Sequence, residues 1–157
     1  MDNLPLIIGV PVLAVAAFSD VRNLRIPNVL SILLILVFLG SCFFLTIPEI
    51  GHRVLFSFVT LSLGFALFAM GFVGGGDVKL LAALVLLIPA SSIVSFAYVF
   101  SFSLFLGVFS IVFARSVVVA ADTEWAGLSQ GRDFPMGVSI AAAGVLQLSL
   151  LHFGQVL

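Results

Sequence analysis

The sequence predicts an all-α membrane protein with about six transmembrane helices. Of the 157 residues, 62% are hydrophobic and only 8% are charged, and the mean hydropathy is +1.37. A water-soluble domain needs a polar surface, and this chain has too few polar residues to build one. Because the bilayer core offers no water to backbone polar groups, spanning segments must be helical. We therefore expect one transmembrane domain over residues 1–157 and no soluble domain.

Composition also excludes several classes of function. The net charge of −1 and the absence of a basic run argue against a nucleic-acid partner. A single cysteine, Cys42, excludes an intrachain disulfide and a multi-cysteine zinc site, and no metal or cofactor is expected. The first residues lack the basic region of a cleaved signal peptide. Membrane helices and short loops must therefore carry the function.

Apolar stretches separated by helix breakers define the six segments. The breaks fall at Pro27, at Pro48, at a glycine cluster after Phe72, at Pro89, and in a polar loop at 122–133. In chain order, the predicted helices cover residues 4–24, 29–47, 54–72, 78–88, 93–114 and 137–151. Most have about the length that a bilayer core requires.

The fourth segment is too short for a full span. It has only 11 residues, 78–88, or roughly 16 Å at 1.5 Å per residue, about half of a bilayer core. If Pro89 marks the far surface, Asp77 begins its helix well below the near surface. If Pro89 only kinks the helix, the fourth helix continues and the fifth begins later. The sequence leaves both arrangements open.

Basic residues indicate the topology. The connections between helices one and two, three and four, and five and six lie on one side, and the other side has Arg53 alone. The basic residues on the first side are Arg22, Arg25, Lys79, Arg115 and Arg132. The positive-inside rule places this side in the cytoplasm. Both termini are then outside, and Asp20 and Asp77 lie in the cytoplasmic half.

These two acids are the candidate site. Asp20 ends the first apolar run, and Asp77 follows Gly74, Gly75 and Gly76. An ionisable side chain within a membrane segment is costly and therefore indicates function. The three glycines remove side-chain bulk and let another backbone, such as an extended substrate, approach closely.

Two opposed carboxylates can hydrolyse an amide with water and no metal. The ionised carboxylate takes a proton from water, and the protonated one donates to the carbonyl oxygen. Neighbouring carboxylates resist double ionisation and share one proton, so both forms coexist. Because Asp77 opens a helix, whose dipole favours negative charge, we expect Asp77 to act as the base and Asp20 as the acid.

Simpler interpretations remain for each residue. Asp77 is a possible helix N-cap, and Asp20 a possible interfacial acid near Arg22 or Arg25. Lys79 follows Asp77 by two residues and so points away from it, toward the surface, a lipid or a substrate group. A small proton- or cation-coupled transporter, a pilus-assembly subunit and an inactive scaffold are the alternative functions.

Three motifs resemble those of one family, the prepilin peptidases. Ser19-Asp20-Val21-Arg22, leading to Ile26-Pro27-Asn28, resembles their first aspartate motif. The run from Gly74 to Leu80 is similar to their GxGD motif with its following lysine and leucine. Phe134-Pro135-Met136-Gly137 resembles the Pro-Tyr-Gly segment that opens their last helix. Met136 replaces the usual tyrosine, so no role for that hydroxyl is carried over.

The resemblance implies a membrane aspartic endopeptidase with Asp20 and Asp77 as its catalytic pair, supported by Gly74, Gly75, Gly76 and Lys79. Its implied substrates are type IV prepilins or pseudopilins, which share the bilayer with the enzyme and are cleaved at the cytoplasmic boundary. The implied location is the bacterial inner membrane. The short first loop and single cysteine are similar to peptidase-only members of tight-adherence (Flp-type) pilus systems, so methyltransferase activity is not expected.

Overall fold

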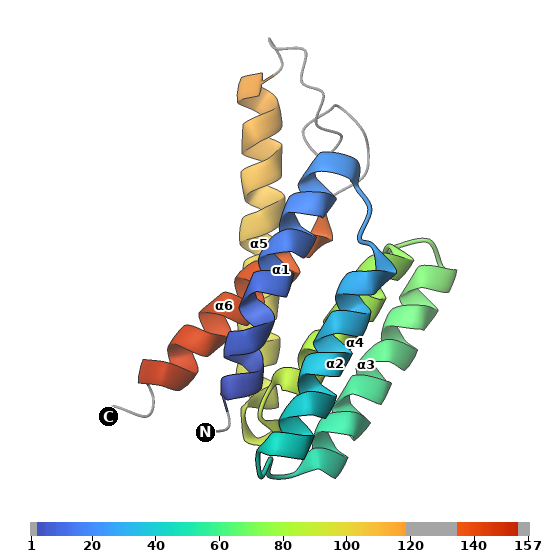
Figure 1. Ribbon diagram of the computed structural model, residues 1–157. Helices are drawn as coiled ribbons and strands as arrows, with labels where there is room; N and C mark the ends of the chain where they lie inside the picture. The colour runs from blue at the N-terminus through green and yellow to red at the C-terminus, as the bar shows by residue number, and fades with distance from the viewer. Residues whose placement is uncertain (1–2, 119–134, 154–157) are drawn as a thin grey trace.

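The computed structural model describes residues 3–118 and 135–153, and the regular structure in that part of the chain is entirely helical (Figure 1). The all-α prediction is confirmed. The elements are α1 (Leu4–Asn23), α2 (Asn28–Phe44), α3 (Ile50–Ala69), α4 (Gly75–Leu87), the 3₁₀ turn η1 (Ala90–Ser92), α5 (Ile93–Val118) and α6 (Met136–Phe153). The predicted polar loop at 122–133, with Arg132, lies outside the described residues.

Most helix boundaries follow the predicted breakers, but α4 begins at Gly75, inside the glycine cluster and before the predicted residue 78. Helix α4 ends at Leu87, and Pro89 precedes the short turn η1 that leads into α5. Proline has no N–H for a helical hydrogen bond, and it disfavours a helical conformation in the residue before it. The alternative in which Pro89 only kinks a longer fourth helix is therefore wrong. Helix α3 begins at Ile50, earlier than the predicted residue 54, because polar residues before 54 are also helical.

Three helical stretches are long and apolar enough to cross a membrane: Leu4–Asn23, Ile50–Ala69 and Ala90–Ser110. Helices α2 and α6 are apolar but shorter, and the 13 residues of α4 extend only about 20 Å. The six predicted helices thus include three of full spanning length in the described residues.

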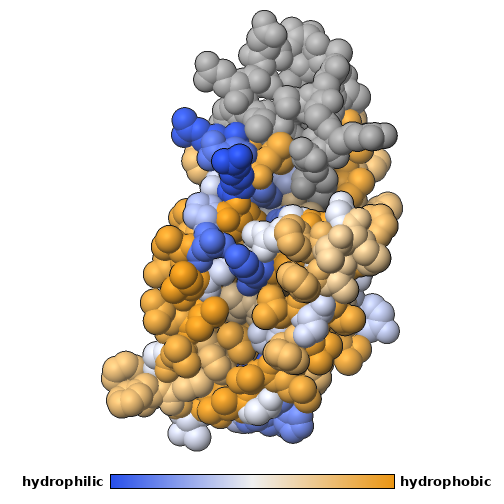
Figure 2. Space-filling view, turned by 90° about the vertical axis from the view of Figure 1, so that its right-hand side faces the viewer, coloured by the Kyte–Doolittle hydropathy of each residue, from blue (hydrophilic) through white to orange (hydrophobic). Residues whose placement is uncertain are grey.

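Large apolar side chains cover the outside of the molecule. Phe43, Phe58 and Phe105 are 88%, 65% and 68% exposed. The face shown in Figure 2 is mostly hydrophobic, and hydrophilic residues gather toward its upper part and its lower edge. Contiguous apolar surface of this extent suits lipid rather than water, as expected for a membrane protein.

The helices pack in two groups around the short helix α4. Helix α6 packs against α1 and α5, whereas α2 and α3 both pack against α4. Helix α4 also contacts α1 and α6, and its Leu80, Leu84 and Leu87 are fully buried. The α1–α2 and α3–α4 connections lie at the upper end in Figure 1, and the start of α1 and the end of α6 lie at the lower end. We use the term upper end below for the end with these two connections.

Polar contacts from α3 hold α4 in place. Arg53, which is 1% exposed, donates from Nη1 to the carbonyl oxygen of Leu87 at 3.3 Å. A cation there complements the negative end of the α4 dipole. One turn further along α3, Ser57 Oγ donates to the Ala82 carbonyl at 2.8 Å. From the sequence, Arg53 was counted as a basic residue of the connection before the third helix. In the structure it is buried and fixes the lower end of α4.

Candidate active site

Asp20 is held between α1 and the start of α6. It lies in the last turns of α1, is 4% exposed, and its main-chain oxygen accepts the Leu24 N–H at 2.8 Å. Its carboxylate Oδ2 accepts a hydrogen bond from the backbone N–H of Gly137 at 2.6 Å. Gly137 is the second residue of α6, so its N–H has no partner within the helix. The alternative of Asp20 as an ordinary interfacial acid does not account for this burial and contact.

Residue 137 must be glycine for this contact to form. A Cβ atom there would lie 2.9 Å from both Cβ and Oδ2 of Asp20, and 3.0 Å from Cδ1 of Ile26. Carbon atoms do not approach so closely without displacement. The glycine of the third motif therefore brings α6 against the first aspartate.

Asp77 lies in the first turn of α4, at the third helical position. The N-cap is Gly74, so the interpretation of Asp77 as the N-cap residue is wrong. The carboxylate folds back over Gly74, where a Cβ atom would lie 2.5 Å from its Oδ2. Its other oxygen, Oδ1, is buried and has no hydrogen-bond partner among the residues that the structure describes. A buried polar atom without a partner is costly in an apolar setting, so this oxygen is an unusual feature of the site.

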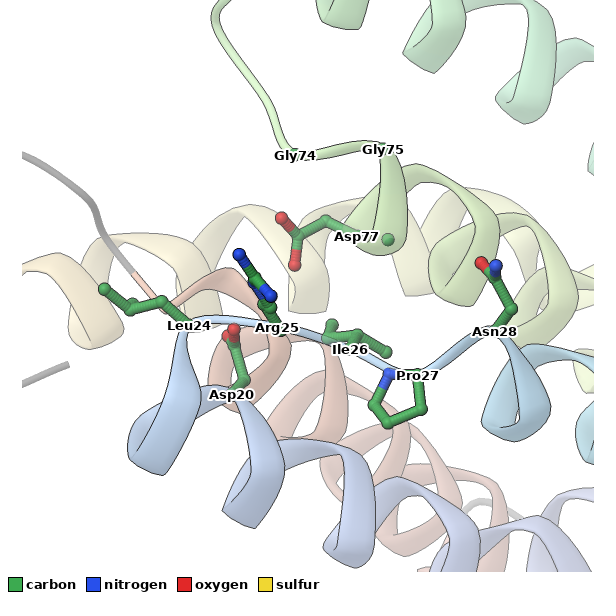
Figure 3. A pocket seen from close by; sticks show the side chains of 10 residues that line it. Asp20, Leu24, Arg25, Ile26, Pro27, Asn28, Gly74, Gly75 and Asp77 are labelled. Carbon is green, nitrogen blue, oxygen red and sulfur yellow. The ribbon is translucent and has the colours of Figure 1, made fainter. Parts of the chain in front are cut away.

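Both carboxylates face one cavity of about 460 Å³ at the upper end (Figure 3). Asp20 enters it from α1, and Asp77 enters it from α4 on the opposite side. The remaining walls come from the α1–α2 connection and from the glycines before Asp77. The cavity is large enough to hold water molecules.

The α1–α2 connection is folded back to form one wall. Leu24 has a φ of 50°, in the left-handed region that few non-glycine residues adopt. Ser19 Oγ donates to the main-chain oxygen of Arg25 at 2.9 Å. At the other end of the connection, Lys79 Nζ donates to Asn28 Oδ1 at 3.1 Å. These contacts fasten the connection to α1 and α4 and direct it over the cavity.

Other parts of the protein pack closely against the glycines before Asp77. A Cβ atom at Gly76 would lie 3.2 Å from the Ile26 carbonyl oxygen, and one at Gly75 would lie 3.3 Å from the Phe68 ring. Close approach of another backbone was predicted, and at Gly76 that backbone is the α1–α2 connection. All three glycines also line the cavity, so their role toward a substrate stays a prediction.

Two residues of the site were missed or assigned another role from the sequence. Arg25 was counted only as a charge for topology or as a neighbour of Asp20, but its side chain enters the cavity (Figure 3). Gly137 was noted within a motif but given no contact. Lys79 is exposed, as predicted, and bonds Asn28 rather than an acid. The side chain of Arg115 is not described.

Both acids lie near helix ends, so helix dipoles act on each of them. Asp77 lies in the first turn of α4, and Asp20 accepts an N–H from the first turn of α6. Asp20 therefore lies at the positive end of α6 but also at the negative end of α1, whereas Asp77 lies at the positive end of α4. The assignment of the base to Asp77 stays a prediction. In the described residues, no group of three His, Cys, Asp or Glu side chains is arranged to hold a metal ion.

Comparison with protein-family models matches residues 7–121 to the type IV leader peptidase family. The match includes Asp20 and Asp77 and ends before the segment around Gly137. Comparisons with curated proteins and with solved structures found no match. The peptidase activity thus follows from the family, and the roles of individual residues are inferred from geometry.

Proposed function

The chain belongs to the type IV leader peptidase family, and we propose that it is an aspartic endopeptidase of the bacterial inner membrane that removes the leader from type IV prepilins or pseudopilins. The observation that carries this proposal is the single cavity faced by Asp20 and Asp77. A pair of carboxylates on opposite sides of one cavity supplies both the acid and the base that amide hydrolysis needs.

In the proposed mechanism, a water molecule lies between the two carboxylates. The ionised acid takes a proton from this water while the water oxygen adds to the scissile carbonyl carbon. The protonated acid gives its proton to the carbonyl oxygen, which forms a tetrahedral intermediate. The C–N bond then breaks, and the amine nitrogen takes the proton that the initially ionised acid removed from water. A hydroxyl proton of the intermediate returns to the acid that was protonated at the start. The pair ends with one proton, as it began.

The surroundings of Asp20 and Asp77 support their proposed roles as the acid/base pair. The N–H of Gly137 holds one oxygen of Asp20, so the other oxygen is oriented toward the cavity. Oδ1 of Asp77 is buried and has no partner among the described residues, so its hydrogen-bonding capacity is unused. Because Asp20 is only 4% exposed, its hydrogen bonds are stronger than they are in water.

The position of the acids supports cleavage at a membrane boundary. Arg22, Arg25 and Lys79 belong to the upper end, which the positive-inside rule assigns to the cytoplasm. A substrate with a hydrophobic segment shares the bilayer with the enzyme, so its insertion depth aligns the bond next to that segment with the acids. Because the bilayer already restricts the position of the substrate, less entropy is lost when its scissile bond is placed between the acids.

The transporter alternative has weaker support. A path for protons or cations across the bilayer requires ionisable groups along its length. Apart from Asp20 and Asp77, the acid in the described residues is Glu49, which is exposed at the lower end. No acid of the described helices lies between these two levels.

Leader removal from a coexpressed tight-adherence-type prepilin tests the proposal. Asp20→Asn and Asp77→Asn keep the side-chain shape but cannot exchange the proton, so each should abolish processing. Glu49→Gln removes an exposed acid at the lower end and should process normally. The readout is the mass of the prepilin and of its new N-terminus. Processing that persists in either aspartate variant contradicts the two-carboxylate mechanism.

A further inference from the structure

A second cavity, of about 390 Å³, lies between α2, α3 and α4. We call it the α2–α3 groove. Ser31 and Ile35 of α2 and Leu61 of α3 belong to its walls, and Ala82 and Ala83 of α4 form its floor. It is separate from the acid cavity and has no part in the mechanism above.

The groove exists because α2 and α3 both pack on α4 without forming a helix pair with each other. Its floor lies close to the α4 backbone because Ala82 and Ala83 stand where the larger side chains found elsewhere on α4 would fill the space. Ile35 and Leu61 are 39% and 40% exposed, so the groove is open to the outside of the bundle. Small residues at such positions let another helix approach closely within a membrane.

The groove adjoins the acid cavity at Asn28. Asn28 lines both, and Lys79, which also lines the groove, donates its hydrogen bond to Asn28 at the junction. A peptide whose scissile bond lies between the acids would reach the groove by crossing over Asn28. The groove extends from there toward Leu86, near the lower end of α4.

A buried hydroxyl distinguishes a peptide from a lipid chain as the occupant. Ser31 is 5% exposed, lines the groove, and its Oγ has no hydrogen-bond partner among the described residues. An unpaired hydroxyl in an apolar setting is costly. An acyl chain cannot satisfy it, whereas a peptide segment offers main-chain or side-chain oxygens.

We propose that the α2–α3 groove binds the hydrophobic segment of the substrate that follows the scissile bond, with Ser31 as a polar contact to it. This proposal rests on the peptidase function proposed above. It assigns the substrate's membrane segment to the outer face of α4, between α2 and α3, rather than to the faces of α5 or α6.

Site-specific photocrosslinking tests the groove directly. A benzophenone amino acid is placed at Leu61 or at Ile35, in the Asp77→Asn background so that the coexpressed prepilin is not consumed. Matched control positions are Leu63 on α3 and Leu36 on α2, which are 64% and 55% exposed but do not line the groove. We expect prepilin crosslinks at the two groove positions and background levels at the controls.

Kinetics give an independent readout. Leu61→Trp narrows the groove and should raise KM about fivefold or more, with kcat nearly unchanged. Leu63→Trp adds the same bulk outside the groove and should leave both constants near the wild-type values. Ser31→Ala should also raise KM without lowering kcat. Melting temperature in detergent establishes that each variant is folded.

Two results overturn the groove proposal while the peptidase function stands. One is normal processing with equal prepilin crosslinking at groove and control positions. The other is crosslinking of phospholipid alone at Leu61 and Ile35. A wild-type chain that processes none of a panel of prepilins, with no groove crosslinks to them, overturns both proposals.

Discussion

Replacing Gly137 with alanine introduces a methyl group into the contact between α6 and Asp20. The added carbon would lie 2.9 Å from Cβ and Oδ2 of Asp20 and 3.0 Å from the end of Ile26. The Ile26 side chain is flexible and can move. Asp20 lies within α1 and is bonded to the same residue, so the methyl group displaces its carboxylate from the Gly137 N–H.

The expected loss follows from the bond that is displaced. A hydrogen bond to a charged group contributes about 1.5–3 kcal/mol. If that energy orients Asp20 in the transition state, its loss slows cleavage roughly 10- to 150-fold. Overpacking also costs stability, typically about 1–3 kcal/mol. Activity should therefore fall much further than stability alone explains.

Two glycine variants serve as controls for the assay. Gly144→Ala, in the same helix, would put a Cβ 2.7 Å from Leu13 Cδ1, so it disturbs the α1–α6 contact away from the acids. It should share the loss of melting temperature but retain most cleavage. Gly40→Ala has no heavy atom within 4 Å of its added carbon. It should leave cleavage unchanged and should not lower the melting temperature, because alanine favours a helix interior over glycine. Purified variants are compared by the initial rate of prepilin cleavage in detergent and by thermal unfolding.

A folded Gly137→Ala variant that cleaves at the wild-type rate would refute the positioning role of the Gly137 N–H. The same conclusion follows if Gly144→Ala loses as much activity at equal stability, because the defect would then belong to α1–α6 packing in general.

Three further predictions concern the surroundings of the acids. Gly76→Ala would put a carbon 3.2 Å from the Ile26 carbonyl oxygen, so we expect a several-fold slower cleavage rate with little change in melting temperature. Lys79→Met removes the hydrogen bond to Asn28 and should slow cleavage by about 2- to 10-fold, the equivalent of roughly 0.5–1.5 kcal/mol. Lys79→Arg keeps a donor and should retain part of the lost rate. Equal cleavage rates for both variants and wild type would show that this bond does not matter. Arg53→Met removes the buried cation at the end of α4 and should lower the free energy of unfolding by about 1–2 kcal/mol, measured by thermal unfolding. A melting temperature equal to that of wild type would contradict the role of Arg53 in fixing α4.

The helix boundaries could be predicted wherever backbone chemistry is local. Proline at 27 and 89 lies between helices, and α3 ends before Gly71, whose φ of 78° is in the left-handed region. The rule is not absolute, because Pro11 lies inside α1, and Gly75 and Gly76 open α4. The start of α3 was predicted too late because hydropathy reports the apolar part of a segment and not its helicity. The polar residues around Arg53 are helical, and the burial of Arg53 depends on a carbonyl group of α4 that no local pattern indicates.

The site was predictable in its two acids but not in their supports. Each aspartate is conspicuous on its own, because a carboxylate within an apolar segment is costly. The bond from Gly137 to Asp20 joins residues 117 positions apart, and only the packing of α6 on α1 creates it. The entry of Arg25 into the cavity depends on the left-handed conformation of Leu24. Leucine rarely adopts that conformation, so no local sequence signal predicts it.

The two groups of helices described above divide the acids between them. Asp20 belongs to the group of α1, α5 and α6, and Asp77 to the group of α2, α3 and α4. The spacing of the carboxylates is therefore a property of an interface, as in enzymes whose active site lies between two domains. Gly9 lies in that interface, where a Cβ would be 2.9 Å from Leu87 Cδ1. Substitutions there would alter the separation of the two acids without touching the cavity that they face, so packing deep within the membrane can tune the geometry of the proposed site.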